Sequence, residues 1–161
     1  MRLGSGERSG NQRLLIRLII DSSNDKEAAE ADRDVELFEE IAWRVLEYHE
    51  ENDEALRLLM YSALEGHELS EIYFRGQVMP ILRMLAEFIE GRVAAGIYRQ
   101  VDAMTAVRGF IGMVNYHALT RKMYPRLSRE LLDIDNREAA RRYTGIFLAS
   151  MLNRGWGEAG E

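Results

Sequence analysis

Histidine is the side chain best suited to acid–base chemistry or metal binding near neutral pH, and the chain has three. His49 and His117 fall on apolar helical faces, where a histidine is usually a core residue with one hydrogen-bond partner. His67 falls at a helix end, and with Glu71 four positions further on it makes only two metal ligands. The residues three positions before the histidines are all apolar: Leu46, Leu64 and Val114. The chain therefore lacks the Glu-x-x-His pairs of a di-iron carboxylate bundle, and we expect no metal and no cofactor.

Nucleophilic catalysis has no signature either. The chain contains no cysteine, and neither a Gly-x-Ser-x-Gly motif nor a glycine-rich phosphate loop occurs. The adjacent carboxylates Glu39 and Glu40, and likewise Glu50 and Glu51, fall on polar helical edges, where exposure to solvent explains them. We expect a protein that is not an enzyme.

The composition is that of one globular domain. A chain of 161 residues with 47% hydrophobic and 30% charged residues is long enough and apolar enough to bury a core. Its longest apolar run, residues 14–20, is interrupted by Arg17 and is too short to cross a bilayer or to resemble a secretion signal. We expect a cytoplasmic protein that makes no contact with membranes.

The charge distribution argues against direct binding to nucleic acid. The net charge is -6, and residues 35–70 carry ten acidic side chains against the two basic side chains of Arg44 and Arg57. Such a region repels phosphate, and no other stretch is basic enough to form a nucleic-acid face unaided. We expect these residues to bind duplex DNA no better than any acidic globular protein does.

The pattern of apolar residues predicts an all-α protein, because prolines and β-branched runs are few and helix formers are many. Five helical regions are expected, at residues 34–49, 53–65, 69–95, 102–124 and 136–153. Asp34 is the expected cap of the first helix, Pro80 starts or kinks the third, and Pro125 ends the fourth. Residues 1–34 are expected to be a mobile leader with room for a short helix, and residues 157–161 a disordered tail.

Aromatic and methionine side chains concentrate in the middle helices. Their simplest role is core packing, but the same residues could form a deformable pocket for a hydrophobic or aromatic ligand, oriented by a few polar groups. The candidate ligand-binding residues are Met60, Tyr61, Tyr73, Met84, Phe88, Phe110, Met113 and His117. Arg83 and Arg92 could meet an anionic group, although solvated salt bridges explain them more simply.

The last two long helices have apolar residues on two faces, whereas a monomer would cover only one. A homodimer joined through a four-helix bundle accounts for both faces, and glycines would allow the helices to approach closely. The expected interface residues are Gly109, Gly112, Tyr116, Met123, Thr144, Phe147, Leu148 and Met151. Residues 35–156 would then form one ligand-binding and dimerisation domain.

Three stretches of this order of helices carry a resemblance to a known family. They are residues 53–69 (DEALRLLMYSALEGHEL), 77–98 (QVMPILRMLAEFIEGRVAAGIY) and 102–119 (DAMTAVRGFIGMVNYHAL). A Leu- and Ala-rich helix, then a proline-started helix ending near glycine, then an Asp-started helix resembles the effector-binding and dimerisation domain of the TetR family of transcriptional regulators. The resemblance covers roughly residues 35–155.

The resemblance implies the effector-sensing half of a regulator, and we expect this regulator to be a repressor. It would form a homodimer and respond to a small hydrophobic or aromatic molecule. Family members begin with a three-helix helix-turn-helix module and a Tyr-x-His/Tyr-Phe signature, and no such string precedes Val35. DNA contact is thus expected only through a helix-turn-helix that is missing from these residues. The alternative is an orphan helical dimer that does not bind DNA and serves as a small-molecule-binding or protein-interaction module.

Overall fold

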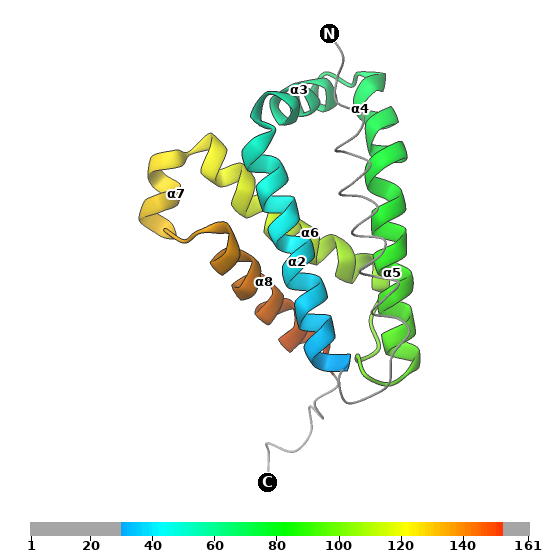
Figure 1. The fold of residues 1–161 in the computed structure, drawn as a ribbon. Coiled ribbons are helices and arrows are strands. Elements are labelled where there is room, and N and C mark those ends of the chain that lie inside the picture. The colour runs from blue at the N-terminus through cyan, green and yellow to red at the C-terminus, as the bar shows by residue number, and fades with distance from the viewer. Residues whose placement is uncertain (1–29, 153–161) are drawn as a thin grey trace.

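The computed structural model describes residues 30–152, which form helices joined by short turns (Figure 1). The predicted all-α class is confirmed, and within the described range the only β-type pairing is an isolated bridge between Tyr98 and Leu152. None of the described helices has both the length and the apolar character needed to cross a membrane. The elements are α2 (Glu30–Glu51), α3 (Asp53–Leu64), α4 (Glu68–Tyr73), the π-helical turn η1 (Phe74–Val78), α5 (Met79–Ala94), α6 (Ala103–Met123), α7 (Pro125–Leu131) and α8 (Asn136–Met151).

Helix α2 runs through the middle of the molecule and packs against α6 and α8 (Figure 1). Its buried side chains recur every three or four residues, the spacing of one helical face: Leu37, Phe38, Ile41, Ala42 and Leu46. The helix begins at Glu30, so the prediction that Asp34 caps it is wrong. Asp34 lies within the helix and is only 1% exposed.

A buried ionic cluster explains why Asp34 can lie inside α2. Arg92, near the end of α5, donates to Asp34 Oδ1 from Nε at 3.1 Å and from Nη2 at 2.7 Å, and the Tyr98 hydroxyl donates to Oδ2 at 2.7 Å. The Arg92 guanidinium also lies over the ring of Phe88, 4.8 Å from its centroid. Because a carboxylate can be buried only when it is paired and hydrogen-bonded, the expectation of a solvated salt bridge is wrong for Arg92.

The region between α3 and α6 is more segmented than predicted. Instead of one helix from residue 69, the chain forms α4, the wider turn η1 and then α5, with Pro80 in the first turn of α5. Proline fits there because the first-turn N–H groups have no helical partner. Gly96 ends the helix as predicted, with a positive φ of 74° that other residues rarely adopt.

The last part of the chain follows the predicted punctuation and adds one element. Asp102 caps α6, since its side chain accepts a hydrogen bond from the Thr105 backbone N–H at 2.7 Å. Pro125 ends that helix but also starts the short helix α7, which was not predicted. Asp135 caps α8 through the Glu138 N–H at 2.8 Å.

Four phenylalanines from four helices join the layers of the core. The Phe38 ring of α2 lies 5.1 Å from that of Phe110 on α6, 5.0 Å from that of Phe147 on α8 and 6.1 Å from that of Phe88 on α5. Phe110 and Phe147 also contact each other, with centroids 4.9 Å apart. Tilted and edge-on aromatic pairs at these distances are favourable beyond the area they bury, so Phe38 of α2 links the side chains of α5, α6 and α8 into one core.

Candidate effector site and dimer face

The predicted ligand-binding residues divide into a group near the core and a group on α3 and α4. Phe88 and Phe110 are buried in the aromatic cluster around Phe38. Met84 and Met113 are half-buried and pack against the same core. These four side chains from α5 and α6 are brought together, and they form a packed layer.

The residues from α3 and α4 lie apart from that layer. Tyr61 is 62% exposed, and Met60 beside it is half-buried. The Tyr73 hydroxyl lies 3.3 Å from that of Tyr48, so it is oriented towards α2. The structure therefore separates the two groups of candidates.

His117 is a buried side chain of α6, as expected for a core histidine. It is 4% exposed, and its Nδ1 lies 3.3 Å from the Tyr143 hydroxyl of α8. Its Nε2 is buried without a hydrogen-bond partner. Burial, and secondarily the positive charge of Arg121, lower the pKa of His117, so the neutral form predominates at neutral pH.

His49 has a comparable environment near the end of α2. Its Nε2 lies 2.9 Å from Asn115 Oδ1, and its Nδ1 is buried without a partner. Burial lowers the pKa of His49, the hydrogen bond to Asn115 opposes this effect, and the charge of Lys122 adds to it. Among the described residues no cluster of three potential metal ligands brings either histidine into a metal site.

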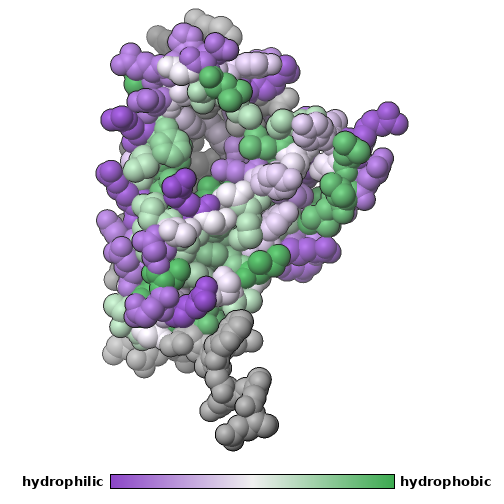
Figure 2. Space-filling model, turned by 180° about the vertical axis from the view of Figure 1, so that it is seen from behind, coloured by the Kyte–Doolittle hydropathy of each residue, from purple (hydrophilic) through white to green (hydrophobic). Residues whose placement is uncertain are grey.

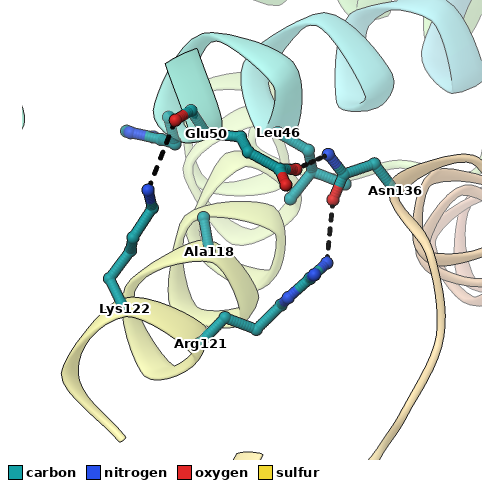
Figure 3. Close-up of a pocket in the computed structure, with 7 residues that line it drawn as sticks. Leu46, Glu50, Ala118, Arg121, Lys122 and Asn136 are labelled. Carbon is teal, nitrogen blue, oxygen red and sulfur yellow. Dashed lines mark hydrogen bonds between the residues drawn. The ribbon is translucent and has the colours of Figure 1, made fainter. Parts of the chain in front are cut away.

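Two adjoining cavities open where the end of α2 meets the end of α6 and the start of α8 (Figure 3). The first, of about 140 Å³, is lined by Leu46, His49, Glu50, Ala118, Arg121, Lys122 and Asn136. The second, of about 230 Å³, is lined by Glu47, Glu50, Arg121, Asp135, Asn136 and Arg137. Neither wall includes any of the eight residues predicted to bind a ligand. Sequence reasoning missed this polar region because its walls come from three helices far apart in the chain.

The predicted dimer residues of α6 lie on the surface. Gly109 and Gly112 are exposed, Tyr116 is 69% exposed and Met123 is 55% exposed. Within residues 30–152, a methyl group added at either glycine would meet no atom within 4 Å from beyond its own turn of the helix. On the back of the molecule a band of neutral and apolar surface crosses the middle between hydrophilic margins (Figure 2).

The predicted dimer residues of α8 lie elsewhere. All four point into the core of the chain itself: Thr144, Phe147, Leu148 and Met151. The outward side of α8 instead presents Gly145 and Ile146, the latter 59% exposed. The face of α8 open to a second chain is thus different from the face that the sequence pattern indicated.

A family model described as the C-terminal domain of AefR-like transcriptional repressors, of the TetR class, matches residues 36–150. The chain belongs to this family. The match covers nearly the whole described range, from α2 to α8. No curated protein and no solved structure matches the chain.

The resemblance to the TetR class is confirmed, and with it the assignment of a regulator's ligand-binding and dimerisation domain. Domains of this class are generally not enzymes. In this TetR-class domain, α6 and α8 pack against each other and onto α2.

Proposed function

We propose that the chain is the effector-sensing and dimerisation domain of a cytoplasmic TetR-type repressor. It forms a homodimer through α6 and the outward side of α8, and it responds to a small hydrophobic or aromatic molecule. The observation that supports the dimer is the exposed face of α6, on which two glycines and Tyr116 lie together and which none of the described residues covers.

The exposed residues suit contact between helices. Gly109 and Gly112 lack side chains, so a second helix can approach the α6 backbone, while Tyr116 and Ile146 supply apolar area beside them. A stable dimer buries roughly 800 Å² on each partner, which is within reach of two long helices that pack against their copies. The four α8 residues predicted for the interface would then support it from within the core.

Sedimentation equilibrium of the 161-residue chain tests the dimer. We expect a dimer at micromolar concentration, and we expect Tyr116→Glu to dissociate it because a charge would be buried without a partner. Glu87→Arg, which changes the charge by two units against one in Tyr116→Glu, lies on the exposed side of α5; it is the control and should leave the dimer intact. A parent chain that sediments as a monomer would contradict the proposal, and far-UV circular dichroism separates dissociation from unfolding.

The proposed effector site is the layer of Met84, Phe88, Phe110 and Met113 between α5 and α6. Methionine side chains adapt their shape, so a ligand could replace part of their packing and favour one of two helix arrangements. Such a shift in α6 would be felt at the dimer face that the same helix carries.

A thermal-shift screen with apolar and aromatic compounds tests this site, since a ligand that binds the folded state raises the unfolding temperature. We expect at least one stabilising compound, and we expect its effect to fall at least tenfold in potency in Met113→Lys. Ile72→Lys, on the exposed surface of α4, is the matched control. A stabilising compound whose potency Met113→Lys leaves unchanged would contradict this location.

A further inference from the structure

The polar cavity of about 140 Å³ between α2, α6 and α8 lies outside the proposed effector site. Figure 3 shows the residues around it: Glu50 and Leu46 on α2, Ala118, Arg121 and Lys122 on α6, and Asn136 at the start of α8. We propose that this cavity binds a short-chain carboxylate, with the carboxylate group at Arg121. The proposal does not depend on the proposed function.

The first argument is the state of Arg121. Its Nη1 donates to Asn136 Oδ1 at 3.0 Å, and within the described residues it has no other hydrogen bond and no carboxylate within 4.0 Å. A guanidinium carries five N–H donors and is always charged. A half-buried arginine whose one partner is a neutral amide is therefore suited to an external anion.

The second argument is the way Asn136 divides the charges. Its Nδ2 donates to Glu47 Oε1 at 2.8 Å and to Glu50 Oε2 at 2.6 Å, while its Oδ1 faces Arg121. The amide thus binds one oxygen of each of these two carboxylates, and neither of them forms an ion pair with Arg121 within the described part of the chain. A second cation adjoins the site, because Lys122 Nζ donates to the Glu50 backbone carbonyl at 3.4 Å.

The third argument is the local electrostatic field. Half-buried His49 and buried His117, near this end of α6, have a lowered pKa, mainly through desolvation but also through the positive charges of Lys122 at His49 and of Arg121 at His117. The wall of the cavity then carries the positive charges of Arg121 and Lys122 against the one negative charge of Glu50. An anion bound there would be attracted rather than repelled.

The fourth argument concerns which anion fits. Leu46 and Ala118 give the cavity an apolar base, which suits a hydrocarbon tail and not the oxygens of inorganic phosphate. A volume of about 140 Å³ holds a molecule the size of about four or five water molecules in the liquid. The neighbouring Glu50 carboxylate favours one negative charge over two. These features together select a monocarboxylate of butyrate size.

NMR titration of the whole chain with sodium butyrate tests the proposal, read at the arginine side-chain Nε–Hε resonances at constant ionic strength. We expect one arginine signal to shift saturably and to be absent in Arg121→Gln, and we expect that variant to bind butyrate at least tenfold more weakly. Arg126→Gln, on the exposed surface of α7 and outside both cavities, should bind like the parent.

A cavity-filling variant keeps the test valid if Arg121→Gln unfolds. Ala118→Leu removes the space at the base and leaves every charge in place, so we expect at least tenfold weaker butyrate binding with the fold retained. Unchanged binding in that variant would overturn the proposal, because the anion would then be held at the surface. Equal shifts with sodium chloride or inorganic phosphate would overturn the choice of a carboxylate.

Discussion

The buried cluster of Asp34, Arg92 and Tyr98 gives the sharpest prediction about stability. Replacing Arg92 with methionine removes the cation and its two hydrogen bonds to Asp34, while an aliphatic side chain still fills most of the space. Asp34 would then remain 1% exposed next to the Tyr98 hydroxyl, without its paired arginine. The change therefore tests the charge and leaves most of the packing intact.

The expected magnitude follows from the burial of both partners. Removing one partner of a buried ion pair costs about 3–5 kcal/mol. Tyr98→Phe removes a single hydrogen bond to a charged group, which contributes about 1.5–3 kcal/mol. At about 4 °C per kcal/mol for a domain of this size, Arg92→Met should lower the unfolding temperature by about 12–20 °C.

Urea unfolding followed by circular dichroism measures both variants against the parent. Arg83→Met, the same substitution on the exposed surface of α5, is the control and should change the free energy of unfolding by less than about 0.5 kcal/mol. The double variant combines Asp34→Asn with Arg92→Met. Its loss in free energy of unfolding should be about 1–3 kcal/mol smaller than the sum of the losses in the two single variants.

Two results would refute this reasoning. If Arg92→Met unfolds at the same urea concentration as Arg83→Met, the ion pair adds nothing to the stability of the fold. If the effects of Asp34→Asn and Arg92→Met are additive, the two side chains do not act as a pair. In either case the pairing with Arg92 would not explain how Asp34 can be buried inside α2, which begins at Glu30.

Two further predictions concern pH and backbone conformation. Folding lowers the pKa of His49 and His117 below the ordinary 6.5, so near and below pH 6.5 the unfolded chain binds more protons than the folded chain. The free energy of unfolding should therefore decrease as the pH falls from 7 to 5, and it should decrease less in His117→Gln. Gly96→Ala should destabilise by about 1–2 kcal/mol, because the φ of 74° is strained for any residue with a side chain. Gly91→Ala, inside α5 with open space around it, should stabilise by up to about 1 kcal/mol; chemical denaturation of both variants checks this pair.

The sequence predicted those parts of the fold that depend on local chemistry. The cap at Asp102, the positive-φ stop at Gly96 and the helix start at Pro80 each depend on interactions within a few residues. The helical period of the apolar residues likewise located the long helices. The TetR resemblance rested on the same punctuation, which is why the family match confirmed it.

The parts that the sequence did not predict depend on contacts between distant residues. Asp34 resembles a helix cap until Arg92 and Tyr98 are brought to it from 58 and 64 positions away. The polar cavity likewise needs Glu50 and Arg121 to meet Asn136, a contact that spans 86 positions between Glu50 and Asn136. No local pattern distinguishes such a carboxylate or arginine from one that faces solvent.

The orientation of α8 shows how the proposed dimer also depends on contacts between distant residues, which a local pattern does not reveal. Phe147 belongs to an apolar stripe that could face either a second chain or the rest of its own chain, and periodicity is identical in both cases. The Phe38 ring of α2, 5.0 Å away, decides the matter, because α2 supplies the aromatic cluster that covers this stripe. Once the stripe is covered from within, only the opposite side of α8, at Ile146, remains open to a partner. The surface on which a homodimer can form is therefore set by the position of α2, even though no residue of α2 was predicted to take part in it.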